Sequence, residues 1–287
     1  MRALILGGSG MLGHGLWRYF SPKYNHIYAT LRKRKDEYES DLFESDHVID
    51  SIDAADFNNI RSILDNIQPE VVLNCIGITK RKESDNSVID VIKLNALLPH
   101  ELAAWGDENK AKIIHFSTDC VFDGKDGAYL DGSMTNADDL YGRTKALGEI
   151  ASPYALTLRS SFIGRELENG TELLEWFLAQ TGRIKGFANA IYTGFTTMEL
   201  NRIIEKIMTE SSEYSGIYNV SSDPISKYDL LRFIKDKMNL DIDISPDYGF
   251  ACDRSLDSTL FRQTFNYTPP DWETMIEELA EQIKPGK

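Results

Sequence analysis

The chain has 287 residues, which is enough for one large domain or two small ones. With 42% hydrophobic and 26% charged residues, its composition is that of a globular protein, which excludes intrinsic disorder, a collagen-like repeat and a disulfide scaffold. Lys and Arg number 31 against 45 Asp and Glu, so the net charge of −14 repels polyanions and argues against nucleic-acid binding.

The sequence also argues against a metal site and a membrane segment. Cys75, Cys120 and Cys252 are far apart and no nearby histidine completes a zinc-binding set, so we expect reduced thiols and no metal. The first apolar run covers only residues 3–6, and no later run reaches the roughly 18 apolar residues of a membrane-spanning helix. We therefore expect a cytoplasmic protein without a membrane partner.

Strand-like and helix-like segments alternate through the first 160 residues. The predicted strands are residues 3–6, 26–30, 47–50, 71–73, 112–116 and 154–159. Helices are predicted after the first turn, where Leu12, Leu16 and Phe20 recur every four residues, and over residues 57–67, 92–105 and 141–150. This order predicts an α/β fold with a doubly wound parallel Rossmann sheet.

After residue 159 the alternation loosens. Helices are predicted near residues 173–178, 198–207, 230–234 and 272–283, with a strand at 217–220. We predict a Rossmann domain of residues 1–160 plus about 187–222. A smaller C-terminal substrate-binding lobe would contain about 161–186 plus 223–287.

Residues 7–13 read Gly-Gly-Ser-Gly-Met-Leu-Gly and follow directly on the first predicted strand. Glycines between a strand and a helix let the backbone approach a pyrophosphate at the helix N-terminus, so this context favours dinucleotide binding. The alternative is a tight turn that needs glycine only for its backbone angles. The predicted cofactor contacts in this turn are Gly7, Ser9, Gly10, Met11, Leu12 and Gly13.

A basic turn, Arg32-Lys33-Arg34, follows the second predicted strand. NAD sites usually carry an acidic residue here to bind the ribose 2′-hydroxyl, whereas Asp36 comes several residues late. The three cations favour a 2′-phosphate and hence NADP(H). The alternative is a solvated basic turn.

Two further segments carry groups capable of proton chemistry. Tyr141 and Lys145 are four residues apart on one face of a predicted helix, where the cation favours the phenolate and lowers the tyrosine pKa. Alone, such a pair is common on helix surfaces. Thr118 lies just after the strand 112–116, at the strand end where parallel sheets bind ligands.

Together, the glycine turn, residues 117–124 and the Tyr141/Lys145 pair resemble the extended short-chain dehydrogenase/reductases. Within that superfamily the chain is most similar to the dTDP-4-dehydrorhamnose reductase group, including at residues 94–96, 216–219 and 254–257. The resemblance runs over nearly the whole chain. Cys120 departs from it, because the group often has tyrosine at this position.

The resemblance implies roles for individual residues. Thr118 would orient the substrate carbonyl and Tyr141 would be the acid, while Lys145 would bind the nicotinamide ribose and lower the pKa of Tyr141. Asn95 would support these groups, although Asn95 and Asn74 could instead cap strand or helix ends. The implied cofactor contacts are Asp50 and Ser51 near the adenine and Asn74, Cys75 and Gly77 after the fourth strand.

Four residues are candidates for substrate binding. Lys80 lies in a cationic loop that could meet a diphosphate or simply be solvated. Arg159 and Arg254 are anion candidates, because arginine makes bidentate contacts with phosphate. The resemblance supports Arg254 more than Arg159, and Asp119 is the fourth candidate.

We therefore expect an NADPH-dependent reductase that converts the 4-keto group of a nucleotide-linked 6-deoxyhexulose to a hydroxyl. The sequence leaves open whether the sugar carries a 2-hydroxyl or a 2-acetamido group and whether its nucleotide is dTDP or UDP. One alternative is an epimerase or 4,6-dehydratase of the same superfamily, although the usual second carboxylate of the dehydratases is replaced by Cys120. Another is an NADP-binding regulatory subunit, as in methionine adenosyltransferase. A homodimer is also a prediction.

Overall fold

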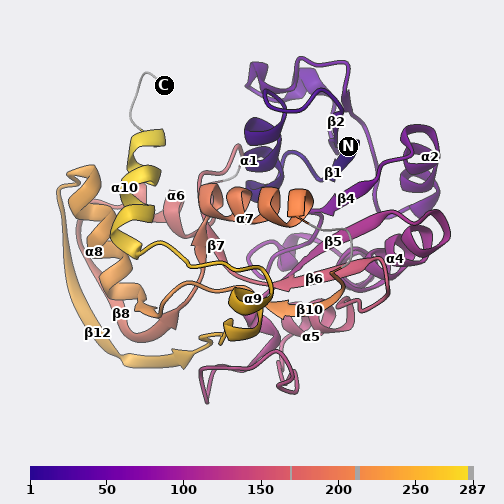
Figure 1. Cartoon of the computed structure of the whole chain (residues 1–287). Helices are drawn as coiled ribbons and strands as arrows, with labels where there is room; N and C mark the ends of the chain where they lie inside the picture. Colours follow the sequence, from indigo (N-terminus) through magenta and orange to yellow (C-terminus); the bar gives the residue numbers. More distant parts are fainter. Residues whose placement is uncertain (169, 211–213, 284–287) are drawn as a thin grey trace. The chain divides into compact units, whose positions relative to one another are not determined.

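The computed structural model describes residues 1–168, 170–210 and 214–283, and the chain divides into two compact units (Figure 1). The first unit contains Met1–Ser117, Asp139–Leu158 and Ile204–Ile217. The second contains Thr118–Asp138, Arg159–Ile203 and Tyr218–Lys287. The division into a cofactor-binding domain and a substrate-binding lobe remains a prediction. Residues 118–138 and 187–203, which we predicted to be in the Rossmann domain, belong to the second unit.

The central sheet has seven strands in the order β10-β6-β5-β4-β1-β2-β3. β1 pairs in parallel with β2 and β4, β4 pairs in parallel with β5, and β2 with β3. This arrangement confirms the predicted doubly wound sheet. The strands are β1 (Ala3–Leu6), β2 (Ile27–Thr30), β3 (Val48–Ile49), β4 (Val71–Asn74), β5 (Lys112–Ser117), β6 (Ala155–Arg159) and β10 (Gly216–Asn219).

The helices of the first unit follow the strands as the sequence predicts, with two differences. The segment predicted as one helix over 92–105 consists of two α-helices joined by a π-helical turn, η4 (Lys93–Leu97). The helix predicted over 141–150 ends at Leu147, so its last three predicted residues are wrong. The α-helices are α1 (Met11–Phe20), α2 (Phe57–Ile67), α3 (Val88–Ile92), α4 (Leu98–Asn109) and α5 (Leu140–Leu147).

The early end of α5 follows from a close approach of two backbones. A Cβ atom on Gly148 would collide with the carbonyl oxygen of Asn95 in η4. Only glycine lets the chain turn here while it stays against η4. The same contact holds α5 next to the segment that carries Asn95.

The core of the first unit lies between the sheet and its helices. All four residues of β1 and of β4 are buried, as expected for parallel strands that are covered on both faces. The apolar cluster includes Leu4, Leu6, Val72 and Ile113 from the sheet, Ile60 and Leu64 from α2, and Leu102 and Trp105 from α4. Each such side chain contributes roughly 1.5–3 kcal/mol through burial.

The second unit is built around a three-stranded sheet, β11-β8-β12. The long strands β8 (Gly182–Tyr192) and β12 (Ile242–Asp253) run in parallel, α8 packs on them, and α10 packs on α8 (Figure 1). The sequence did not predict β8 or β12. The other elements are β7 (Phe162–Ile163), β9 (Phe195–Thr196), β11 (Ile225–Ser226), α6 (Leu173–Leu178), α8 (Lys227–Met238), α9 (Thr259–Thr264) and α10 (Trp272–Ile283), and α7 (Thr197–Glu210) has residues in both units.

Short 3-10 turns complete the chain: η1 (Lys35–Glu37), η2 (Asp41–Phe43), η3 (Glu83–Asp85) and η5 (Asp119–Val121). Over the described part of the chain, no helix has the length and apolar character needed to cross a bilayer.

Candidate active site

The glycine turn joins β1 to α1 in a form that suits an anion. Gly7 has φ +80°, and a Cβ atom on Gly13 would collide with the Gly7 carbonyl oxygen, so both positions need glycine. Gly10 begins α1 without a capping side chain, and the first turn of α1 holds no acidic residue. The backbone N–H groups at this helix end are therefore available to a phosphate, and the turn fits a dinucleotide.

The basic turn after β2 lies beside the residues expected near the adenine. Arg32 is exposed, whereas Arg34 forms an ion pair with Asp36 at 2.7 Å. The Asp50 carboxylate accepts a 2.8 Å hydrogen bond from the Lys35 backbone N–H, and the Ser51 N–H donates to the Lys33 carbonyl at 3.2 Å. The structure thus brings the predicted cations together with Asp50 and Ser51.

The segment after β4 is tied to η4 by Asn95, which is fully buried. Its Oδ1 accepts from the Ile78 N–H at 2.8 Å, and its Nδ2 donates to the Ile78 carbonyl at 2.9 Å and to Thr144 Oγ1 at 3.3 Å. A Cβ atom on Gly77 would lie 3.3 Å from Asn95 Oδ1 and 3.9 Å from Lys145 Nζ. Asn95 therefore links this segment to α5 through hydrogen bonds to Ile78 and Thr144, a set of contacts that we call the Asn95 clamp.

α5 carries Tyr141 and Lys145. Asp139 caps the helix, because its side chain accepts a 2.7 Å hydrogen bond from the Gly142 N–H, and it also pairs with Lys80 at 2.6 Å. Lys80, predicted to bind substrate, thus lies at the N-terminal end of the helix that carries the predicted acid. Tyr141 is half-buried and Lys145 is buried.

Lys145 points to the middle of the sheet. Its Nζ donates to the Phe116 carbonyl at 2.7 Å and lies 3.4 Å from His115 Nε2. Burial lowers the pKa of Lys145 to about 8, while charge interactions with Glu149 and Cys75 act in the opposite direction. Burial raises the pKa of the Cys75 thiol, so Cys75 stays protonated.

Thr118 belongs to the second unit, where it caps η5. Its hydroxyl accepts from the Cys120 N–H at 3.1 Å and donates to the Asp119 carboxylate at 3.2 Å. Thr118 and Asp119 are both buried. Burial raises the pKa of Cys120 to about 12, so this thiol is not a thiolate nucleophile at neutral pH.

The two candidate arginines of the second unit have different surroundings. The Arg159 guanidinium is buried, donates to the Asp131 carbonyl at 2.9 Å and lies 5.2 Å from the Phe122 ring centre. Arg254 donates through Nε to the Phe122 carbonyl at 2.8 Å, and its Nη1 lies 3.8 Å from Cys120 Sγ. Arg254 therefore lies beside the Thr118–Cys120 turn.

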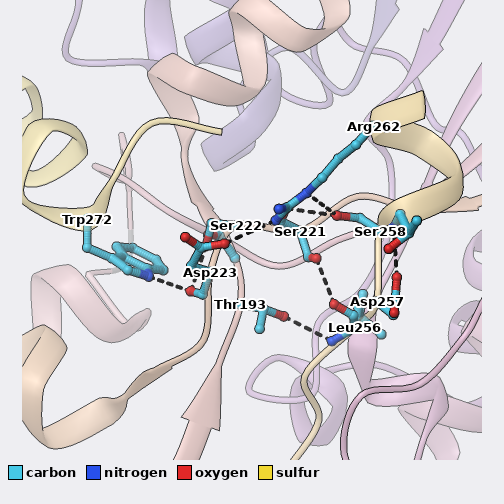
Figure 2. Close-up of polar contacts among 11 residues, drawn as sticks. Thr193, Ser221, Ser222, Asp223, Leu256, Asp257, Ser258, Arg262 and Trp272 are labelled. Atoms are coloured by element: carbon cyan, nitrogen blue, oxygen red, sulfur yellow. Dashed lines mark hydrogen bonds and ion pairs between the residues drawn. The ribbon is translucent and has the colours of Figure 1, made fainter. Parts of the chain in front are cut away.

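A hydroxyl network holds the segment that follows Arg254 (Figure 2). Ser221 Oγ donates to the Leu256 carbonyl at 2.7 Å, and the Leu256 N–H donates to Thr193 Oγ1 at 3.2 Å. Arg262 donates to the Ser221 carbonyl and to Ser258 Oγ at 3.1 and 3.0 Å. These contacts hold Leu256 and Ser258 against the loop after β10.

Sequence reasoning missed one residue in each unit. His115 contacts Lys145, and its signal was a histidine within the apolar strand 112–116. Tyr192 is buried, and its hydroxyl has no hydrogen-bond partner among the described residues, although it interacts electrostatically with Asp119 and Cys120. An isolated tyrosine at a strand end gave no signal.

The parallel sheet, the glycine turn and the buried lysine define a Rossmann-type α/β protein with a dinucleotide-type site. The sequence model of the RmlD substrate binding domain family matches residues 1–284, and the chain belongs to this family.

Among the similar proteins is dTDP-4-dehydrorhamnose reductase of Aggregatibacter actinomycetemcomitans, with 27% identity over 97% of this chain and 98% of the relative. The bovine methionine adenosyltransferase 2 subunit beta is 27% identical over 52% of this chain and 42% of its own length. The solved structure of dTDP-4-dehydrorhamnose reductase from Bacillus anthracis in complex with NADP has a TM-score of 0.80 and 21% identity, with 99% of each chain covered. This last likeness shows a shared fold.

Proposed function

We propose that this chain is an NADPH-dependent reductase that converts the 4-keto group of a nucleotide-linked 6-deoxyhexulose to a hydroxyl. The observation that carries the proposal is the buried Lys145 one helical turn from Tyr141, in the same unit as a glycine turn that fits a dinucleotide. The full-length match to a dTDP-4-dehydrorhamnose reductase supports the substrate class.

In this proposal Tyr141 gives its proton to the carbonyl oxygen of the substrate. The cationic form of Lys145 favours the phenolate that Tyr141 leaves behind, and the Thr118 hydroxyl orients the carbonyl. When bound, NADPH supplies the hydride to the carbonyl carbon. The chain thus contributes orientation and a positioned acid.

The cofactor would be held by the two turns after β1 and β2. Gly7, Ser9, Gly10, Met11, Leu12 and Gly13 would hold the pyrophosphate, while Asn74, Cys75 and Gly77 would line the nicotinamide side. Arg32 and Lys33, with Arg34, would select the 2′-phosphate of NADP(H), and Asp50 and Ser51 would lie near the adenine. The B. anthracis reductase of similar fold was solved in complex with NADP, which supports this assignment.

The second unit would supply the substrate contacts, with Asp119 and Arg254 as the principal candidates. Arg254 beside the Thr118–Cys120 turn is a donor suited to a diphosphate. Arg159 is the weaker candidate, because its guanidinium already serves Asp131 and Phe122. Lys80 would act from the first unit.

The test is NADPH oxidation with dTDP-linked and UDP-linked 4-keto-6-deoxysugars, each with a 2-hydroxyl or a 2-acetamido group, generated in place by a dehydratase. We expect stoichiometric oxidation with one of them, which also identifies the nucleotide and the 2-substituent. Interconversion of epimers without net NADPH consumption would instead indicate an epimerase.

A second candidate is a regulatory subunit that binds NADP(H), favoured by the match to methionine adenosyltransferase 2 subunit beta over half of the chain. A stable complex with a catalytic subunit, together with no turnover of any ketosugar by protein that binds NADPH, would support it.

We also propose that the chain forms a homodimer. Support comes from large apolar side chains that are exposed on three neighbouring elements of the first unit, α3, η4 and α5: Val88, Ile89, Ile92, Leu97 and Leu147. A second copy could bury the same patch through a two-fold symmetric contact.

A further inference from the structure

Asn74 and His115 are direct neighbours on adjacent strands. The parallel register of β4 and β5 pairs Asn74 with His115, and both side chains are fully or almost fully buried. Asn74 Nδ2 lies 3.1 Å from His115 Nδ1, and the other ring nitrogen, Nε2, lies 3.4 Å from Lys145 Nζ. Three polar groups thus form a row from β4 through β5 to α5.

The backbone fixes the orientation of the Asn74 amide. Its Oδ1 accepts a 3.2 Å hydrogen bond from the Ile76 N–H, so its NH₂ group must face His115. Nδ1 of the imidazole therefore accepts a hydrogen bond. A neutral imidazole that accepts at Nδ1 carries its proton on Nε2. Burial keeps His115 neutral, since it lowers the pKa of this group well below the usual value.

This tautomer matters for Lys145, because the Nε2–H group points at Nζ. An ammonium has three donors and no acceptor, whereas a neutral amine has a lone pair that can accept from Nε2–H. A cationic Lys145 turns its own N–H donors toward the Nε2–H group, and moving the ring proton to Nδ1 would bring it against the NH₂ of Asn74. Turning the amide would in turn leave the Ile76 N–H without its acceptor.

We propose that Asn74 and His115 are positioning residues that favour the neutral amine of Lys145 and thereby set the upper limit of the pH range in which Lys145 is a cation. The proposal deepens the proposed function, because it assigns control of the lysine in that site. The donation from Lys145 to the Phe116 carbonyl is compatible with both protonation states.

Other groups around Lys145 act on its charge without selecting the tautomer. Glu149 accepts from Ser117 Oγ at 2.7 Å and favours the cation by its charge. Cys75 lies after β4 as a protonated thiol. His100 on α4 interacts electrostatically with His115 and contacts the Leu147 carbonyl at 2.7 Å.

The first experiment is long-range ¹⁵N NMR of the free protein labelled in histidine, with the His115 signals assigned by their loss in His115→Gln. We expect the proton of His115 on Nε2 and no titration of the ring between about pH 5 and 8, where an ordinary histidine titrates. A proton on Nδ1, or a ring that titrates in this range, would overturn the proposal. This measurement needs no substrate, so it stands apart from any failure of the reductase assignment.

The second experiment follows the ¹³Cε shift of Lys145 against pH, assigned by its loss in Lys145→Met. In Asn74→Asp, the carboxylate accepts from Nδ1–H, so Nε2 can accept from the ammonium. Asn74→Leu removes the same donor without adding charge. We expect the pKa of Lys145 to rise in both, by about one unit, or tenfold in proton affinity, in Asn74→Asp and by less in Asn74→Leu.

An unchanged pKa in both variants, with folded spectra, contradicts the proposal. A rise in Asn74→Asp alone, without a change of tautomer, would assign the effect to charge and would also contradict it. In the reductase assay, kcat/KM of wild type should fall above about pH 8, and this limb should move to higher pH in Asn74→Asp. A shifted NMR titration without any reductase activity would leave the positioning role intact and reject the proposed function alone.

Discussion

Tyr141 and Lys145 lie one turn apart on α5 but differ in burial, since the phenol is half-buried and the ammonium is enclosed. This difference suits a Tyr141 phenol that contacts the substrate and a Lys145 ammonium that acts on the phenol without contacting the substrate carbonyl. Replacing Tyr141 with Phe removes the proton donor and keeps the ring. We expect a loss of at least about 100-fold in kcat, with the Kd for NADPH within about threefold of wild type, measured by turnover and fluorescence titration. Normal turnover would reject Tyr141 as the acid.

Burial of Lys145 also has a cost in stability. Its folded-state pKa of about 8 lies below the unfolded value of 10.5, so the unfolded chain binds more protons between these values. The loss of unfolding free energy caused by burying the protonated Lys145 is greatest below pH 8, and it decreases as the pH rises toward 10.5. We expect Lys145→Met to be more stable than wild type by about 1–3 kcal/mol at pH 7, with the difference shrinking across this window in urea unfolding. A difference independent of pH would contradict this account.

The basic turn offers a matched pair of arginines. Arg32 is exposed, whereas Arg34 is held by Asp36. We expect Arg32→Ala to weaken NADPH binding about tenfold relative to NADH, because a charge-assisted contact with the 2′-phosphate is lost, and Arg34→Ala to have a smaller effect. Both affinities are measured by titration of nicotinamide fluorescence. Equal losses for NADPH and NADH in Arg32→Ala would remove Arg32 from the 2′-phosphate site.

At the scale of elements, the contact between α5 and η4 positions Tyr141 and Lys145 relative to Asn95. Gly148→Ala would drive a Cβ atom into the Asn95 carbonyl oxygen, so α5 must move away from the clamp. We expect the unfolding free energy to fall by about 1–3 kcal/mol. We also expect kcat to fall more than in a control variant without this collision. Gly132→Ala is the control, since a Cβ atom there meets nothing within 4 Å. Equal behaviour of the two variants would show that the contact does not matter.

The elements differ in how well the sequence predicts them. The bounds of α2, α6 and α10 match the predictions. α2 and α10 each have a clear apolar face with helical spacing, and α6 is a short apolar segment. β8 and β12 were missed. Their exposed faces carry pairs that only the fold brings together, such as Arg183 with Asp243 at 2.7 Å. Most residues of β8 and β12 are exposed or half-buried, so neither strand forms the buried apolar run that revealed β1 and β4.

The site shows the same division. The glycine turn and the Tyr141/Lys145 spacing are local, so the sequence revealed them. The clamp of Asn95 on Ile78 and the row from Asn74 to Lys145 depend on strand register and on a π-helical turn, which leave no short motif.

At the scale of the whole molecule, the exposed apolar patch on α3, η4 and α5 bears on assembly. We expect Ile89→Glu to convert the proposed dimer to a monomer, because a carboxylate in this patch would be buried in the contact between the two copies. Met134→Glu, a change at an exposed methionine of the second unit, is the control. Light scattering gives the mass of each. A wild-type monomer, or a dimer that persists in Ile89→Glu, would reject this interface.

The pairing of β8 with β12 has a consequence for how the protein is made. β12 lies 60 residues after β8 and is its parallel partner, so β8 emerges from the ribosome well before the strand that completes its sheet. In the first unit, Ala3 of β1 pairs with Val71 of β4, so β1 also waits for a partner that lies far along the chain. During synthesis at about 5–20 residues per second, the nascent chain passes several seconds with the β12 side of β8 unpaired. During this interval the open edge of β8 is a template for pairing with another chain, which is the kind of surface that chaperones protect.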